Sequence, residues 1–265
     1  MKNQKTTNSN RRSFLKKASL ASVGTLTLGQ LNAQDDSFVT KQLQNLPKDL
    51  TILFQGDSIT DGGRNRGSYY ANNTWGGMGS GYVIQAVSQL LGENPNANLR
   101  CYNRGISGHK VFQLAERWEE DCMQIRPDVL SILIGVNDFW HTLTHSYKGS
   151  AKTYEDDFRK LLDRTLKELP DLKLMICEPF VVNGGSAIKE ADWFPAFMSY
   201  QYAAQNIATE YKASWVPFQK TFDDALKNAS VKALCPDGVH PSLSCLLYTS
   251  PSPRDATLSR MPSSA

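Results

Sequence analysis

A serine, an aspartate and a histidine in this sequence are of the types that nucleophilic catalysis by a serine hydroxyl needs. Ser58 lies in the stretch ILFQGDSITDGG, and far along the chain Asp237 and His240 stand three residues apart in PDGVHP. A histidine can take the proton of a serine hydroxyl, and a carboxylate can hold the imidazole in the right tautomer. Glycine, aspartate and serine also gather in ordinary turns, so Ser58 needs such partners before it becomes a candidate nucleophile.

Two further stretches contain candidate donors for a developing oxyanion. NRGISG ends at Gly108, where the lack of a side chain lets the backbone approach a substrate closely, and GVND contains the amide side chain of Asn137. With the backbone N–H of Ser58, the N–H of Gly108 and the amide of Asn137 form a candidate oxyanion hole. Asp57 and Asp138 are predicted to hold their loops through hydrogen bonds to the backbone.

The elements that must position these residues alternate along the chain. Five short apolar runs are typical of parallel strands covered on both faces: 51–54, 99–102, 129–134, 172–177 and 215–218. Helical patterns fall between or after them at about 82–91, closed by Gly92, and at 111–125, 153–169, 194–211 and 221–227. Thr153 is the expected N-cap of the third helix, with acids at 155–157 near the positive end of its dipole.

This alternation predicts an α/β fold with one doubly wound parallel sheet. In such a sheet, ligands bind beyond the carboxyl ends of the strands. Residues 56–58, 103–108 and 135–138 each follow a predicted strand. We therefore expect them to share one rim, to which the loop 236–241 brings the histidine.

The blocks GDSIT, NRGISG, GVND and DGVHP occur in this order, and over most of residues 51–243 the chain resembles the SGNH, or GDSL-like, hydrolase family. The resemblance implies a flavodoxin-like three-layer sandwich with a five-stranded parallel sheet. It also implies Ser58 as nucleophile, Gly108 and Asn137 as oxyanion donors, and Asp237 with His240 as the orienting acid and base. The α/β-hydrolase signature is not matched, because GDSIT lacks the second glycine of GxSxG.

Within that family, GDSITDGGR, GMGSGY and IGVNDFW look most like the acetylxylan esterase branch. This implies removal of acetyl groups from xylan-like oligo- or polysaccharides through an acyl-serine intermediate, without a cofactor. Trp75, Trp140 and Trp193 lie in or near predicted rim loops and could stack on sugar rings, with core packing as the other interpretation of each. The alternative functions are a lipolytic esterase, lysophospholipase or thioesterase on the same site, and a carbohydrate-binding protein without catalysis.

The first 33 residues are predicted to be an export signal. RRSFLK, residues 11–16, resembles the twin-arginine pattern, and a mildly apolar stretch leads to a candidate cleavage site after Ala33. Residues 34–50 are then a linker and 51–243 the hydrolase domain. No later segment is apolar and long enough to cross a bilayer, so we expect a soluble periplasmic or secreted protein without a membrane partner, either monomeric or a homo-oligomer.

Charge, cysteine spacing and glycine spacing argue against a nucleic-acid-binding, metal-binding or dinucleotide-binding protein. Six of the 29 basic residues lie in the acid-free first 33 residues, which leaves 23 against 26 acidic ones and removes the argument for a nucleic-acid partner. The five cysteines show no CxxC spacing and the four histidines are scattered, so we expect buried thiols and no metal site. The glycine-rich stretch 76–81 lacks the spacing of a dinucleotide-binding turn and is predicted to be a loop.

Residues 244–265 depart from the family pattern. The resemblance leads one to expect an amphipathic helix after Ser242, whereas SCLLYTSPSPRDATLSRMPSSA contains three prolines and scattered polar residues. We interpret this segment as a non-family tail and a candidate sequence artefact, resembling translated sequencing-adapter read-through, with a natural Ser/Pro-rich tail as the alternative. Residues after about Leu247 are expected to be disordered or poorly packed.

Overall fold

The computed structural model describes residues 46–68 and 71–248. The predicted signal peptide, most of the predicted linker and the chain beyond residue 248 lie outside the described residues, and with them the prediction for the end of the tail. Five strands form one all-parallel sheet in the order β2-β1-β3-β4-β5, which confirms the predicted fold class. Their bounds are β1 Thr51–Gly56, β2 Arg100–Asn103, β3 Val129–Leu133, β4 Lys173–Cys177 and β5 Ser214–Val216.

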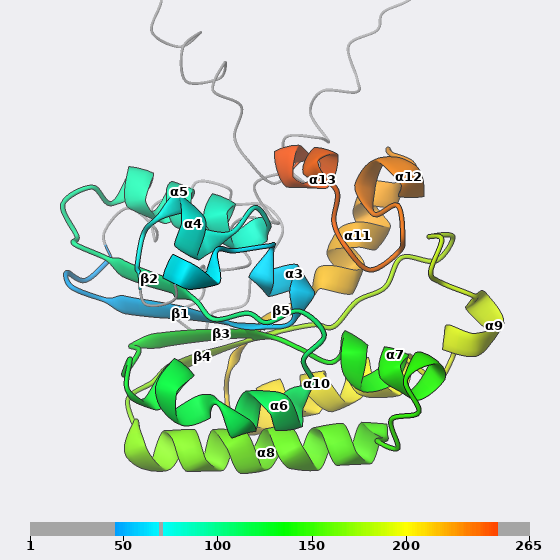
Figure 1. Cartoon of the computed structure of the whole chain (residues 1–265), viewed down its shortest axis with the longest axis horizontal. Helices are drawn as coiled ribbons and strands as arrows, with labels where there is room; N and C mark the ends of the chain where they lie inside the picture. Colours follow the sequence, from blue (N-terminus) through cyan, green and yellow to red (C-terminus); the bar gives the residue numbers. More distant parts are fainter. Residues whose placement is uncertain (1–45, 69–70, 249–265) are drawn as a thin grey trace, which may run out of the picture.

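Helices cover both faces of this sheet, so the domain has three layers (Figure 1). The longer helices are α5 Tyr82–Glu93, α7 Val136–Thr144, α8 Ala151–Glu168, α10 Met198–Glu210 and α11 Phe218–Leu226. The shorter ones are α3 Ser58–Asp61, η1 Arg66–Ser68, α4 Trp75–Met78, α6 Val111–Glu116, η2 Glu119–Met123, α9 Glu190–Trp193, α12 Val231–Leu234 and α13 Leu243–Tyr248.

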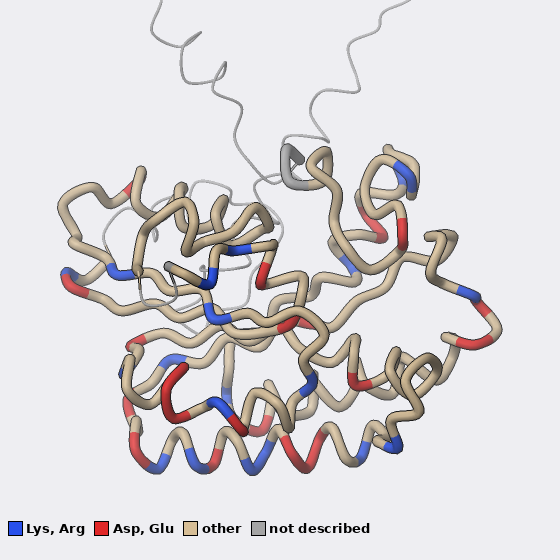
Figure 2. The backbone as a smooth tube through the Cα atoms, viewed as in Figure 1, with Lys and Arg blue, Asp and Glu red and all other residues tan. Residues whose placement is uncertain are grey.

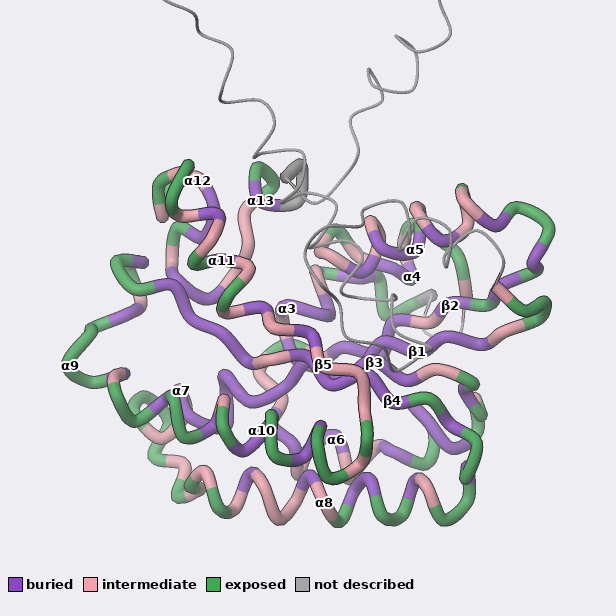
Figure 3. Tube along the Cα trace, turned by 180° about the vertical axis from the view of Figure 1, so that it is seen from behind, coloured by how far each residue is buried: buried purple, intermediate pink, exposed green. Residues whose placement is uncertain are grey.

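Strand β1 shows how the layers are joined. Alternate side chains of a strand point to opposite faces. Ile52 and Phe54 pack with α5 in one hydrophobic cluster, whereas Leu53 packs in the larger cluster with residues of α6, α8 and α10. All six residues of β1 are buried, as the continuous apolar run indicates (Figure 3).

Helix α8 has a buried inner face and a charged outer face (Figure 2). Its N-cap is Ser150, whose hydroxyl accepts from the N–H of Thr153 at 3.1 Å, so the predicted N-cap at Thr153 is wrong by one turn. The acids at 155–157 therefore lie beyond the first turn. They pair instead with basic neighbours on the helix surface: Glu155 with Arg159, Asp156 with Lys152 and Asp157 with Lys160.

The predicted helix 111–125 is interrupted in the structure. α6 ends at Glu116, and η2 continues as a single π-helical segment. Two buried side chains account for the change of winding: the indole of Trp118 donates to Thr165 Oγ1 at 2.8 Å, and Asp121 lies against Arg117 and Arg104. Both side chains are fully buried, and the wider π-helical turn accommodates them.

Other boundaries also differ from the predictions. A helix was expected over 194–211, but α9 and α10 are separated around Pro195, which cannot donate an N–H and disfavours helical backbone before it. β5 ends at Val216 and α11 begins at Phe218, so the last predicted strand was too long and its helix began too late. α5 runs past Gly92 to Glu93.

Two segments without a predicted helix contain short helices. The first three residues of the glycine-rich stretch, 76–78, form α4 together with Trp75, and the hydroxyl of Thr74 caps this helix. After Ser242, where the prolines and polar residues of the tail were interpreted as a departure from the family pattern, the chain forms the six-residue α13; the Ser242 hydroxyl accepts from the N–H of Cys245 at 3.1 Å. All five cysteines are buried free thiols, as predicted. Among the described residues, no helix is long and apolar enough to cross a membrane.

Candidate active site

Ser58, His240 and Asp237 form a hydrogen-bonded chain. Ser58 Oγ lies 2.7 Å from His240 Nε2, and His240 Nδ1 lies 2.7 Å from Asp237 Oδ2. A proton on Nδ1, shared with the carboxylate, leaves Nε2 as the acceptor that faces the hydroxyl. Burial raises the pKa of Asp237, but hydrogen bonds from His240 and from the backbone N–H of Val239 outweigh it, so its pKa is held below the usual range.

Ser58 is the first residue of α3, directly beyond strand β1. Asp57 caps this helix, accepting from the N–H of Ile59 at 3.0 Å, as predicted for the carboxylate. At Gly56 a Cβ atom would lie 2.3 Å from the carbonyl oxygen of Leu133, so no side chain fits between strand and helix. The turn that presents the serine therefore requires glycine at this position.

The loop after β2 is fixed against α3. A Cβ on Gly105 would lie 2.3 Å from the backbone N of Asp61, so the two segments touch through their backbones. Asp61 Oδ2 accepts from both the N–H and the hydroxyl of Ser107, at 3.0 and 2.8 Å. These contacts position Gly108, whose φ of +81° is strained for residues other than glycine.

Asn137 comes from the third strand end, in the first turn of α7. It is 3% exposed, and its Nδ2 donates to the carbonyl oxygen of His109 at 3.3 Å. The side chain is thus held beside the loop that contains Gly108. The three strand ends β1, β2 and β3 are neighbours in the sheet, so the structure brings the predicted segments to one rim.

The loop 236–241 reaches this rim through a tight backbone contact. Gly238 has a φ of +88°, and a Cβ there would lie 2.7 Å from the carbonyl oxygen of Val182. Its own carbonyl accepts from the N–H of Val182 at 2.7 Å. This anchoring, on a segment that follows β4, sets the position of Asp237 and His240.

Two buried carboxyl groups flank the chain of Ser58, His240 and Asp237. Burial raises the pKa of both Asp57 and Asp138 to about 7, and repulsion from Asp57 contributes to the shift of Asp138. Asp138 Oδ1 accepts from the N–H of Val111 at 3.2 Å, which is the predicted loop-holding role. The second oxygen of each carboxyl is buried without a hydrogen-bond partner among the described residues, which suits a protonated acid.

Lys110 and His141 adjoin the candidate oxyanion donors and were not selected from the sequence. Lys110 Nζ lies 3.0 Å from His141 Nδ1, and His141 Cε1 lies 3.9 Å from the position of a Cβ on Gly108. Burial and the nearby Lys110 lower the pKa of His141 to about 4, so its imidazole is neutral at pH 7. The sequence feature that could have singled out His141 is its spacing: it comes four residues after Asn137, so both residues lie on the same face of a helix.

The three candidate sugar-stacking tryptophans have different environments. Trp75 is 84% exposed at the start of α4, and Trp140 is partly buried. Trp193 is 1% exposed and packs against Phe139, with ring centroids 5.2 Å apart. Trp193 is therefore a core residue, and its assignment to the substrate-binding surface is corrected.

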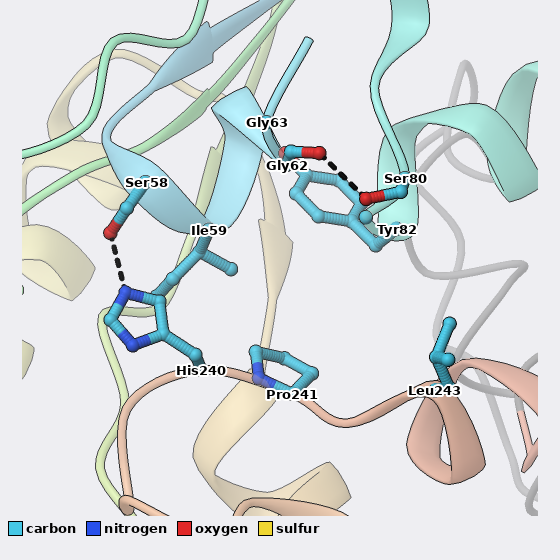
Figure 4. Close-up of a pocket in the computed structure, with 10 residues that line it drawn as sticks. Ser58, Ile59, Gly62, Gly63, Ser80, Tyr82, His240, Pro241 and Leu243 are labelled. Carbon is cyan, nitrogen blue, oxygen red and sulfur yellow. Dashed lines mark hydrogen bonds between the residues drawn. The ribbon is translucent and has the colours of Figure 1, made fainter. Parts of the chain in front are cut away.

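A pocket of about 310 Å³ opens beside Ser58 and His240. Figure 4 shows it between the start of α3, the loop before α5, and the chain that runs from His240 to α13. Among the described residues, no three His, Cys, Asp or Glu side chains are grouped as a metal site requires.

Known proteins share both the fold and the blocks that form this site. The profile of the GDSL-like Lipase/Acylhydrolase family matches residues 54–244. An acetylxylan esterase from Geobacillus stearothermophilus is 35% identical over 195 residues, covering 72% of this chain and 86% of the relative.

Solved structures of the same kinds of protein are also similar to this chain. A candidate GDSL-like lipase from Parabacteroides merdae is 50% identical, with a TM-score of 0.75 over 77% of this chain and 94% of that one. A catalytic mutant of Axe2, an acetylxylan esterase from Geobacillus stearothermophilus, is 30% identical, with a TM-score of 0.68 over 77% of this chain and 91% of that one. The chain belongs to the GDSL-like lipase/acylhydrolase family. It is a carboxylic ester hydrolase.

Proposed function

We propose that this protein is an exported serine esterase that removes acetyl groups from xylan-like carbohydrates. The observation that carries the mechanism is the chain of two 2.7 Å contacts from Ser58 through His240 to Asp237. The substrate class is supported by the similarity to acetylxylan esterases, and export by the twin-arginine pattern at residues 11–16.

In the proposed reaction, His240 Nε2 takes the proton of Ser58 as Oγ attacks the ester carbonyl carbon. The negative charge on the carbonyl oxygen is stabilised by the N–H groups of Ser58 and Gly108 and by the amide of Asn137. His240 then gives its proton to the alcohol oxygen as the ester C–O bond breaks, which leaves an acetyl-Ser58. Water, activated by His240, releases acetate and restores the hydroxyl.

The test of this mechanism is Ser58→Ala. We expect the purified variant to keep the melting temperature of the wild type and to lose at least about four orders of magnitude in kcat on acetylated xylobiose, because the covalent step is removed. His240→Ala should behave similarly. Substantial activity of folded Ser58→Ala would disprove the serine mechanism.

The family also includes lipases, so the acyl group needs a separate test. Acetyl esters should be cleaved much faster than octanoyl esters of the same alcohol, and equal or inverted rates would favour a lipolytic enzyme.

For export, replacing Arg11 and Arg12 with lysine should retain the protein in the cytoplasm. Unchanged fractionation would exclude the twin-arginine route.

A further inference from the structure

The pocket beside His240 is far larger than an acetyl group requires. Its volume of about 310 Å³ falls at the lower end of the range for small-molecule sites, about 300–1,000 Å³. It extends from Ser58 and His240 past Gly62, Ser80 and Tyr82 to Leu243 (Figure 4). An acetyl group alone would leave most of this volume unfilled.

The chemistry of the proposed reaction decides which part of the ester lies on this side. His240 must protonate the alcohol oxygen, so that oxygen has to lie within hydrogen-bond reach of Nε2. The pocket begins at this histidine. Of the described residues that line it, none is an oxyanion donor other than Ser58; Gly108 and Asn137 are not part of its wall.

Hydrogen bonds and close backbone contacts fix the residues that form the walls of the pocket. The N–H and the hydroxyl of Ser80 both donate to the carbonyl oxygen of Gly62 at 2.8 Å, and a Cβ on Gly62 would lie 2.6 Å from the backbone N of Gly81. Tyr82 is fixed by a 3.2 Å contact of its hydroxyl with Thr60 Oγ1. A Cβ on Gly63, by contrast, would meet nothing within 4 Å.

The lining indicates an uncharged ligand with both apolar and polar faces. Apart from Tyr82 and His240, the described lining residues carry no ionisable side chain. Ile59, Pro241 and Leu243 offer apolar surface, while Ser80 and the glycine backbones offer hydrogen-bonding groups. A pyranose ring, with apolar C–H groups and hydroxyls, has this combination of properties.

We propose that this pocket binds the alcohol part of the ester, a neutral sugar residue, and that the acyl group lies outside it. The assignment rests on the proposed serine mechanism, because it uses the position of the proton donor. It adds to that function a ligand for the pocket residues Gly62, Ser80 and Tyr82 and for Leu243 at the start of α13.

The experiment compares Ser80→Phe with the matched control Ser80→Ala. Both variants lose the hydroxyl bond to Gly62, but only phenylalanine fills the pocket. Ester size is varied at the alcohol with methyl acetate, 2-naphthyl acetate and acetylated xylobiose, and at the acyl group with methyl acetate and methyl butanoate. Melting temperatures report folding, and kcat/KM is measured for each ester.

We expect Ser80→Phe to lower kcat/KM for the two large alcohols relative to methyl acetate by about tenfold or more. Ser80→Ala should shift that ratio by less than about threefold, and the acetyl-to-butanoyl ratio should stay constant in both. A changed acetyl-to-butanoyl ratio with a constant alcohol ratio would show an acyl pocket. No change in either ratio would show that the pocket is outside the substrate path. Both results would overturn the proposal.

Leu243→Ala gives a second measurement if Ser80→Phe does not fold, since Leu243 is 75% exposed and its loss should not destabilise the domain. It should weaken the large alcohols selectively, by about threefold, and an unchanged alcohol ratio would count against the assignment. Failure of the proposed function is seen separately, in the wild type's preference between acetyl and octanoyl esters and in the activity of Ser58→Ala.

Discussion

The two regions that adjoin Ser58 are constructed differently. The side with the candidate oxyanion donors, here called the oxyanion side, is formed by Gly108, Lys110, Asn137 and Asp138 and contains buried side chains fixed by hydrogen bonds. The pocket side, formed by Gly62, Ser80, Tyr82 and Leu243, includes exposed side chains around an open volume. In Figure 1, α7 of the oxyanion side lies below α3, whereas α13 of the pocket side lies above α3.

The difference fits the roles that we propose for the two regions. Donors that stabilise a developing charge are effective when they are already oriented and shielded from water. A site for a neutral alcohol needs shape and a few hydrogen bonds, so it tolerates exposure. Substitutions on the oxyanion side should therefore affect all esters, and those on the pocket side only some.

The largest effect is expected for Trp193→Ala, behind the oxyanion side. Trp193 is fully packed against Phe139 of α7, and its loss should reduce the free energy of unfolding by about 3–5 kcal/mol through the cavity it leaves. Urea unfolding measures this. A loss below about 1 kcal/mol would show that α9 does not support α7.

Asn137→Ala should come next. Removing one oxyanion donor is expected to lower kcat by about 10²–10³-fold, and by the same factor for methyl acetate and acetylated xylobiose. Steady-state kinetics on both esters check this, with Asn137→Asp as a variant of similar size that lacks the amide donor. A loss restricted to the sugar ester would place Asn137 on the pocket side of the comparison instead.

Asp138→Asn tests the buried proton on the oxyanion side. The folded pKa of Asp138, raised by burial to about 7, exceeds its unfolded value of 3.8. Between these values the folded state binds more protons than the unfolded state, so stability falls as pH rises from about 4 to about 7. Asparagine removes this loss and keeps an oxygen for the N–H of Val111.

The melting temperature of Asp138→Asn relative to wild type should therefore increase by a few degrees between pH 5 and pH 8. Lys110 and Asp57 also face this carboxyl, so Lys110→Met is the control for a general change of charge. A difference that is constant with pH would mean that Asp138 is ionised throughout.

The smallest effect is expected at Trp75, the first residue of α4. Because its side chain is 84% exposed, Trp75→Ala should change the melting temperature by no more than about 1 °C. If the ring stacks on a sugar, KM for acetylated xylooligosaccharides should rise about two- to tenfold, with no change for methyl acetate. Equal KM values for both proteins would leave Trp140 as the remaining sugar-stacking candidate.

The site was more predictable than the boundaries of the helices. Ser58, Gly108 and Asn137 follow strands whose apolar runs are unmistakable, and parallel strands place their carboxyl ends at one edge. Helix boundaries failed where a competing partner decided the winding. Trp118 and Asp121, for example, draw η2 into a π-helical turn through contacts with residues far along the chain.

By itself, the sequence determined the sheet, the three strand ends that contain candidate site residues, and the loop with Asp237 and His240. These depend on local patterns: apolar runs, glycines at tight turns, and the spacing of acid and histidine. Only the tertiary structure decided that Trp193 is core while Trp75 is exposed, that Lys110 contacts His141, and that a pocket opens beside His240. Burial and contact between distant segments depend on how elements pack, and no short stretch of sequence contains that information.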